Sequence, residues 1–240
     1  MNVEKDPDVE WVAELAAVPA TEARAAIDTA IDERSLYRHL AREHRAEGRS
    51  SYVEIDAPLE LHALVQLLRP RHVVEVGVSS GVSSAYILAA LDRNGTGTLH
   101  SLDRPSRPRS PSRSRGGASW SLPPGRTTGW AVPSRLRGRW DLRIGDKSPL
   151  LTLLAKELPG IELFVYDVPH NCLESGLEFR ALDPVLPRGA VAIVDHGPAG
   201  DLCTGLRGWA VRRRGRPVRR NGLGLFGMRC RTTTGAEVVA

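Results

Sequence analysis

The 240-residue sequence predicts an α/β fold with a doubly wound, mostly parallel sheet and helices on both faces. Three observations predict it. Helical stretches alternate with short strands through most of the chain. Strands such as 161–167 and 190–196 are apolar almost throughout, as expected when both faces of a sheet are covered. The stretch 72–84, HVVEVGVSSGVSS, joins an apolar strand to a glycine-spaced turn and then to a helix.

The N-terminal part of the chain is predicted to be helical. From about residue 8 to residue 47, apolar residues recur at helical spacings among charged neighbours, which predicts two or three amphipathic helices. Residues 57–68 predict another helix, ended by Pro70. We expect residues 1–50 to be a helical extension and residues 51–240 to be the main domain. The apolar faces of the first helices suit either internal packing or a homodimer.

The rest of the chain continues the alternation. We expect strands at 72–76, 97–103, 140–146, 161–167 and 190–196, and helices at 83–91, 148–158 and 174–182. Residues 104–139 are rich in Pro, Gly, Ser and Arg, and we interpret them as a loop or lid insertion. Its residues Trp120 and Trp130 either shape a substrate pocket or anchor the loop to the core. We expect Asn221 and Gly222 to be turn residues between two short strands near the C-terminus.

The turn after the strand 72–76 is the most specific pattern in the chain. Glu75 lies in the strand, and Gly77 and Gly81 let the backbone bend sharply and approach a ligand closely. The spacing is E-x-G-x-x-x-G, with Ser79 in place of a middle glycine. It therefore differs from the G-x-G-x-x-G fingerprint of dinucleotide sites, although it still indicates a nucleotide-type cofactor.

Two further residues fit such a cofactor. Ser83 lies at the start of the helix after the turn, where free main-chain amides favour a carboxylate or another anion. Asp103 ends the next strand, where an acid can accept hydrogen bonds from both hydroxyls of a ribose. The predicted unit is thus β-α-β, with an acid at the end of its second strand.

The turn resembles motif I of class I S-adenosylmethionine-dependent methyltransferases. The resemblance implies a Rossmann-like fold, whose seven-stranded sheet closes with a C-terminal antiparallel hairpin. In this family the acid before the first glycine supports the amino-acid end of the cofactor, the acid after the second strand holds the ribose, and residues after the third strand lie beside the adenine. The implied cofactor-binding residues are Glu75, Gly77, Ser79, Ser80, Gly81, Ser83, Asp103, Gly145, Asp146 and Asp167.

Two later stretches are similar to the small-molecule O-methyltransferases of the metal-dependent catechol and antibiotic-tailoring types. In YDVPH, Asp167 matches a metal-ligating aspartate, and His170 lies where the catechol enzymes carry the base that deprotonates the hydroxyl. In AIVDH, Asp195 and His196 match the Asp–Asn pair that completes the metal site. His196 departs from the pattern, because an imidazole nitrogen suits Mg²⁺ poorly and favours Mn²⁺, Fe²⁺ or Zn²⁺. The alternative is no metal, with His196 orienting the substrate.

The resemblance implies transfer of a methyl group to a hydroxyl, or less readily an amine, of a small molecule in specialised metabolism. His170 would remove the proton, since an ordinary histidine pKa suits that task. We expect direct displacement without a covalent enzyme intermediate. Two alternatives stay open: an S-adenosylmethionine-binding enzyme of other chemistry, such as cyclisation, and a basic RNA-binding protein on a Rossmann-like scaffold.

Composition narrows the class of protein. The net charge is +5, and only three of the 33 Lys and Arg residues are Lys. Arginine gathers at 104–117 and 211–220 without interleaved aromatic residues, so we expect solvated surface rather than a nucleic-acid site. The polar N-terminus and the lack of a long apolar run predict a cytoplasmic protein that does not span a membrane. Cys172, Cys203 and Cys230 are far apart in sequence and are expected to be reduced thiols.

Overall fold

The computed structural model describes residues 7–47, 57–104, 122–168, 172–195, 201–220 and 224–232. The strands in these residues are β1 (His72–Val76), β2 (Thr98–Asp103), β3 (Trp140–Ile144), β4 (Leu163–Tyr166), β5 (Val191–Asp195), β6 (Val218–Arg219) and β7 (Leu225–Arg229). The helices are α1 (Val9–Ala16), α2 (Ala20–Ile31), α3 (Arg34–Ala46), α4 (Pro58–Leu68), α5 (Val82–Asn94), α6 (Lys147–Glu157), α7 (Cys172–Leu182) and α8 (Thr204–Arg212), with 3-10 turns η1 (Ser134–Arg139) and η2 (Asp183–Val185).

Within the described residues the strands form one seven-stranded sheet in the order β3-β2-β1-β4-β5-β7-β6. Strands β1 to β5 pair in parallel, and β7 runs antiparallel to both β5 and β6. This arrangement confirms the predicted fold class, including the C-terminal hairpin and the N-terminal helices. The turn residues Asn221 and Gly222 lie outside the described residues.

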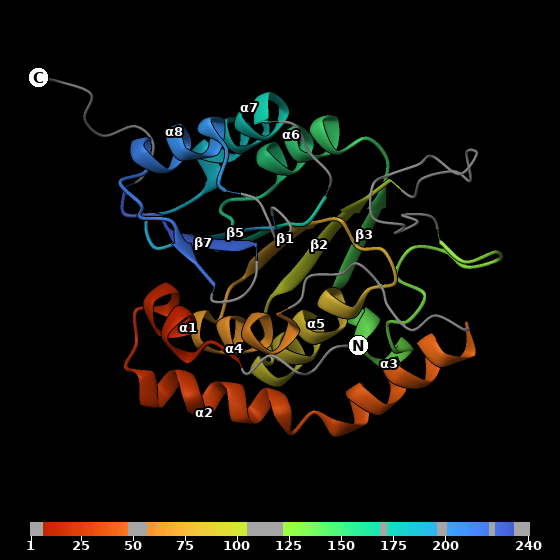
Figure 1. The fold of residues 1–240 in the computed structure, drawn as a ribbon. Helices are drawn as coiled ribbons and strands as arrows, with labels where there is room; N and C mark the ends of the chain where they lie inside the picture. Colours follow the sequence, from red (N-terminus) through yellow and green to blue (C-terminus); the bar gives the residue numbers. More distant parts are fainter. Residues whose placement is uncertain are drawn as a thin grey trace, which may run out of the picture.

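Helices cover both faces of the sheet (Figure 1). α1, α4 and α5 lie on one face, α6, α7 and α8 lie on the other, and α2 and α3 form an outer layer beyond α4 and α5. Because side chains alternate along a strand, β1 contributes Val73 to one apolar cluster and Val74 to the other. No helix among the described residues is long and apolar enough to cross a membrane.

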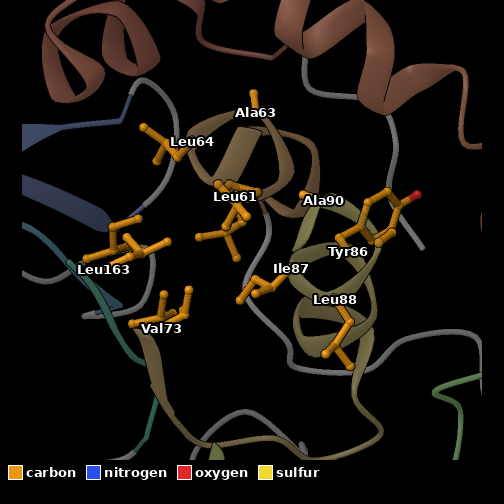
Figure 2. Close-up of a cluster of buried hydrophobic side chains, with 14 of the residues drawn as sticks. Leu61, Ala63, Leu64, Val73, Tyr86, Ile87, Leu88, Ala90 and Leu163 are labelled. Carbon is orange, nitrogen blue, oxygen red and sulfur yellow. The ribbon is translucent and has the colours of Figure 1, made fainter. Parts of the chain in front are cut away.

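The larger apolar cluster joins the N-terminal helices to the sheet. Figure 2 shows Leu61 and Leu64 of α4 and Ile87 of α5 gathered with Val73 of β1 and Leu163 of β4. Side chains of α1, α2 and α3 belong to the same cluster: Trp11, Leu15, Ile27, Leu36 and Leu40. The first three helices therefore share the core of the sheet. A domain boundary near residue 50 stays a prediction, because residues 48–56 lie outside the described part of the chain.

Helix α8 is absent from the sequence-based prediction. Its buried side chains Leu206, Trp209 and Ala210 follow helical spacing, but glycines and arginines between them weaken the pattern. The expectation that the arginines at 211–220 are all solvated surface is also wrong. Arg213 and Arg220 are only 1% and 3% exposed, and Arg220 forms an ion pair with the buried Glu60 of α4.

His62 of α4 is a polar side chain in the apolar layer between helices. It is fully buried, and within the described structure neither of its ring nitrogens has a hydrogen-bond partner. The ring of Tyr86 meets it edge-on, with 6.4 Å between ring centroids. Burial, and to a smaller extent the charge of Arg93, lowers the pKa of His62 from 6.5 to about 4. The folded chain therefore keeps this histidine neutral.

We expect His62 to make the fold sensitive to mild acid. The pKa in the folded state lies below the unfolded value, so the unfolded chain binds the proton first as the pH falls. Stability that is complete above about pH 6.5 is lost towards pH 4, by up to roughly 3 kcal/mol. His62→Leu should remove this loss, which urea unfolding at pH 7.5, 5.5 and 4.5 would measure. Parallel losses in the wild type and the variant would contradict the assignment.

Candidate functional site

The carboxyl ends of the parallel strands meet along one edge of the sheet. Val76 lies in register with both Leu102 and Tyr166, and Tyr166 lies in register with Val194. This register brings the residues that end or follow these strands to the same edge, and the residues after β3 lie beside them. They are Gly77, Asp103, Gly145, Asp146, Asp167 and Asp195. Ligands of open α/β sheets bind at this edge.

Both glycines of the turn after β1 are required by close contacts. Gly77 and Gly81 have φ angles of 94° and 93°, in the left-handed region that favours glycine. A Cβ atom on Gly77 would lie 1.8 Å from the main-chain oxygen of Asp167, and one on Gly81 would lie 2.5 Å from Cγ2 of Val132. The turn thus packs tightly against the end of β4 on one side and against the segment before η1 on the other.

Glu75 is fully buried below the turn and holds three hydroxyl groups. Its Oε1 accepts a hydrogen bond from Ser83 at 2.7 Å, and its Oε2 accepts bonds from Ser84 at 2.6 Å and Ser101 at 2.7 Å. Burial raises the pKa of Glu75, while the three hydroxyl donors oppose that shift. Glu75 therefore ties the start of α5 and the middle of β2 to β1.

This arrangement changes what Ser83 offers to a ligand. Its hydroxyl proton is donated to Glu75, so its side chain presents an acceptor rather than a donor. Gly81, the residue before α5, has no side chain to cap the first turn of that helix. The main-chain amides at the start of α5 are the groups suited to a carboxylate.

Asp103, at the end of β2, lies partly buried over the glycine turn. Its Oδ2 accepts a hydrogen bond from the hydroxyl of Thr128 at 2.9 Å, and the main-chain amides of Ser79 and Arg104 also donate to its carboxyl group. Burial raises the pKa of Asp103, and these three donors oppose the shift. A carboxylate has about four acceptor positions, so Asp103 can take a further donor.

Residues 126–132, which we call the covering segment, lie directly on the glycine turn. The amide of Gly129 donates to the oxygen of Ser79 at 2.9 Å, and the amide of Ala131 donates to the oxygen of Ser80 at 3.0 Å. Arg137 of η1 also binds the covering segment, because its Nη2 donates a 2.8 Å hydrogen bond to the main-chain oxygen of Gly129. Trp120, the other tryptophan of the predicted insertion, lies outside the described residues.

Helix α3 closes the outer side of the covering segment. Nε2 of His44 lies 2.9 Å from Oγ of Ser80, and its ring lies 5.1 Å from the ring of Trp130. The guanidinium of Arg126 lies 4.9 Å from the centre of the same tryptophan and forms a 2.6 Å ion pair with Glu47. The last turn of α3 is therefore part of the wall of the site.

The sequence carried no signal for Thr128 or His44 as parts of the site. Thr128 belongs to a long irregular segment whose course cannot be derived from periodicity, and His44 lies 36 residues before Ser80. Ser84 lies within the stretch 72–84, but its bond to Glu75 depends on how α5 is oriented over β1.

The structure separates the predicted adenine-side residues. The amide of Gly145 donates to the main-chain oxygen of Asp103 at 2.9 Å, which brings the turn after β3 against the end of β2. The side chain of Asp146 is mostly exposed and pairs with Arg104. Gly145 is thus held beside Asp103, whereas the carboxylate of Asp146 lies in solvent.

The predicted metal and base residues are described only in part. Asp167 and Asp195 lie at the ends of the neighbouring strands β4 and β5, both partly exposed. His170 and His196 lie outside the described residues. No group of three metal-ligating side chains occurs in the described part of the chain. The two carboxylates suit a hard divalent ion, but the complete set of Asp167, Asp195 and His196 stays a prediction.

A buried network supports the end of β4 from the opposite face. Glu178 of α7 is almost fully buried and accepts hydrogen bonds from the hydroxyl of Tyr166 at 2.5 Å, from Lys147 at 2.6 Å and from Ser148 at 2.5 Å. These bonds join the start of α6 and the middle of α7 to the residue just before Asp167. The network therefore holds the end of β4 in place, and with it the main chain at Asp167.

Comparisons with known proteins agree with this geometry. Residues 74–196, which are 123 of the 240 residues, match the family described as "Methyltransferase domain". A comparison with curated proteins gives no match.

Solved structures share the fold at low sequence identity. A putative O-methyltransferase from Klebsiella pneumoniae is 17% identical with a TM-score of 0.54, and the O-methyltransferase from Bacillus cereus in complex with SAH is 16% identical with a TM-score of 0.53. Each alignment covers 82% of this chain and 90% of the other. The O-methyltransferase TomG from Streptomyces achromogenes, involved in tomaymycin synthesis and solved with SAM, is 18% identical over 82% of this chain and 89% of that chain, with a TM-score of 0.55.

Proposed function

The chain belongs to the methyltransferase-domain family and is an S-adenosylmethionine-dependent methyltransferase, and from that premise we propose that it methylates a hydroxyl group of a small molecule. The observation that carries the proposal is the glycine turn, with Glu75 buried below it, Asp103 above it and the uncapped start of α5 beside it. S-adenosylmethionine, when bound, supplies a sulfonium methyl group that a substrate oxygen can attack.

The residues at the turn fit the parts of that cofactor. On our proposal Asp103 accepts a hydrogen bond from the ribose, and the amides at the start of α5 bind the carboxylate. Gly77, Ser79, Ser80 and Gly81 form the floor against which the cofactor lies. We propose further contacts from Gly145, from the main chain of Asp146 and from Asp167. Glu75 would support the cofactor indirectly, because it holds Ser83 and the turn from below.

We propose that the acceptor binds on the β4 and β5 side of the edge. O-methylation is the reaction named for three solved structures with this fold, one of them in the synthesis of tomaymycin. We assign removal of the hydroxyl proton to His170, which follows Asp167 by three residues. Asp167, Asp195 and His196 are the ligands that we propose for a divalent ion, such as Mg²⁺, Mn²⁺ or Fe²⁺. The covering segment would exclude water from the transferred methyl group.

Calorimetric titration with S-adenosylhomocysteine tests the cofactor site. We expect Asp103→Asn to weaken binding about 10- to 100-fold, because a hydrogen bond to a charged acceptor contributes about 1.5–3 kcal/mol. Asp92→Asn is the matched control, since Asp92 is an exposed acid near the far end of α5, and its affinity should equal that of the wild type.

The outcomes separate the rival functions. A folded wild type that binds neither S-adenosylmethionine nor its product would overturn the proposal, and salt-dependent binding to arbitrary RNA would then support the RNA-binding alternative. Equal affinities for Asp103→Asn and the wild type would remove Asp103 from the site. Repeating the titration with a chelator tests the metal. Product mass tests the reaction, because methylation adds one methylene unit and cyclisation does not.

A further inference from the structure

Two cysteines that are far apart in the sequence meet in the fold. Cys172 is the first residue of α7, and Cys203 is the residue immediately before α8, 31 positions later. The two helices approach closely there: a Cβ atom on Gly205 would lie 2.6 Å from the main-chain oxygen of Cys172 and 3.3 Å from its Sγ. Sγ of Cys203 lies 4.0 Å from the same oxygen.

The sulfur of Cys172 lies at the amino end of α8 among hydrogen-bond donors. The amide of Gly205 donates to it at 3.0 Å, and Oγ1 of Thr204 lies 3.3 Å away. The thiol of Cys203 also hydrogen-bonds to it, and this contact, followed by those from Thr204 and Gly205, lowers the pKa of Cys172. The positive end of the α8 dipole favours the same thiolate form.

Cys203 has the opposite character. Burial, followed by its bond to the neighbouring sulfur, raises the pKa of Cys203. The pair thus consists of an accessible sulfur that is stabilised as a thiolate and a neighbouring sulfur that stays protonated. This is the arrangement of a nucleophilic and a resolving cysteine.

We propose that Cys172 and Cys203 are a peroxide-oxidisable pair that forms a reversible disulfide between the starts of α7 and α8. The Cys172 thiolate attacks one peroxide oxygen, so that an S–O bond forms, the O–O bond breaks and the released hydroxide takes a proton to become water. The Cys203 thiol then attacks the sulfenic sulfur. An S–S bond forms, the S–O bond breaks, and the second oxygen leaves as water with the thiol proton.

In total, these two reaction steps convert two thiols and one peroxide into one disulfide and two waters. A dithiol reductant converts the disulfide back into two thiols. Sγ of Cys203 already lies 4.0 Å from the main-chain oxygen of Cys172, and the disulfide requires the two sulfurs to close to about 2.05 Å. The disulfide would join the two helices that follow β4 and β5, beyond the strand ends that carry Asp167 and Asp195.

Cys230 provides an internal comparison. It is only 1% exposed, and burial raises the pKa of its thiol. Cys230 belongs to the apolar cluster on the α7 and α8 face of the sheet, where the side chain of Arg213 only opposes the effect of burial on its thiol. It should neither react with peroxide nor join a disulfide.

The test is dilute hydrogen peroxide added to the folded full-length chain, followed by thiol titration, intact mass and non-reducing peptide mapping. We expect free thiols to fall from three to one, with a loss of two hydrogens, a cross-link between the peptides of Cys172 and Cys203, and full recovery with dithiothreitol. Cys230→Ser should still form the cross-link. Cys172→Ser should lose it, and Cys203→Ser should stop at a sulfenic acid on Cys172 that dimedone traps.

Three results would overturn the proposal. The first is a chain that still has three free thiols after peroxide treatment. The second is a disulfide that includes Cys230. The third is a wild-type chain that accumulates a sulfenic acid on Cys172 without forming the cross-link. Circular dichroism of each variant before oxidation distinguishes lost reactivity from lost folding. None of these measurements depends on cofactor binding, so their outcome is independent of the proposed function.

Discussion

Arg220→Met is expected to destabilise the folded chain by about 3–5 kcal/mol, because it leaves the charge of Glu60 buried without its partner. Nε and Nη2 of Arg220 lie 3.0 Å and 2.8 Å from Oε1 of Glu60, and both side chains are only 3% exposed. The amide of Asp8 is a further donor to the same oxygen, at 3.2 Å. One amide cannot compensate a buried carboxylate that has lost a guanidinium. Urea unfolding at pH 7.5 would measure the loss.

A double variant separates the buried charge from the lost packing. Arg220→Met combined with Glu60→Leu removes both charges, so it should regain much of the stability that the single variant lost. Arg212→Met is the matched control in the same arginine-rich stretch, because Arg212 is exposed at the end of α8 and its loss should cost no more than about 0.5 kcal/mol. If Arg220→Met were as mild as Arg212→Met, or if the double variant were no more stable than the single one, the ion pair would not have this role.

Gly77→Ala is expected to abolish detectable binding of S-adenosylhomocysteine and to lower stability by at least about 2 kcal/mol. The new methyl group would lie 1.8 Å from the main-chain oxygen of Asp167, so β1 or β4 must shift. The bond from the amide of Asp167 to the oxygen of Val76, 2.8 Å long, lies at that contact. A shift there moves the turn that we propose as the floor of the cofactor site. Calorimetry and urea unfolding would measure the two effects.

Gly95→Ala is the matched control for this substitution. Gly95 also has a positive φ angle, of 71°, but a Cβ atom there would meet nothing within 4 Å. Gly95→Ala should therefore show only the backbone strain, about 1 kcal/mol, with unchanged cofactor affinity. Equal affinity in Gly77→Ala and Gly95→Ala would show that the contact with Asp167 does not shape the site.

Much of the scaffold was accessible from local sequence. The apolar run at 72–76, the glycines at 77 and 81, and the acid that ends each of several strands all act through neighbours a few residues away. Parallel pairing then gathers strand ends at one edge whatever the details of packing, so Glu75, Asp103, Asp167 and Asp195 could be assigned to that edge in advance. The observed ends of several strands and helices differ from the predicted ends by one to three residues, as at β4. Main-chain pairing, rather than the side-chain pattern, decides where such a strand ends.

The contacts that complete the site could not be predicted in this way. Thr128 on Asp103 and His44 on Ser80 depend on how an irregular segment and an outer helix return to the glycine turn. The burial of Arg220 could not be predicted for the same reason. Glu60 and Arg220 are 160 positions apart, and nothing near Arg220 in the sequence indicates a buried acid. The sequence by itself determined the order of elements, the parallel sheet and the edge where chemistry can occur, because these follow from short-range periodicity and turn geometry. Only the tertiary structure decided which side chains meet across the fold, including Cys172 and Cys203, because those meetings depend on helix packing over the whole sheet.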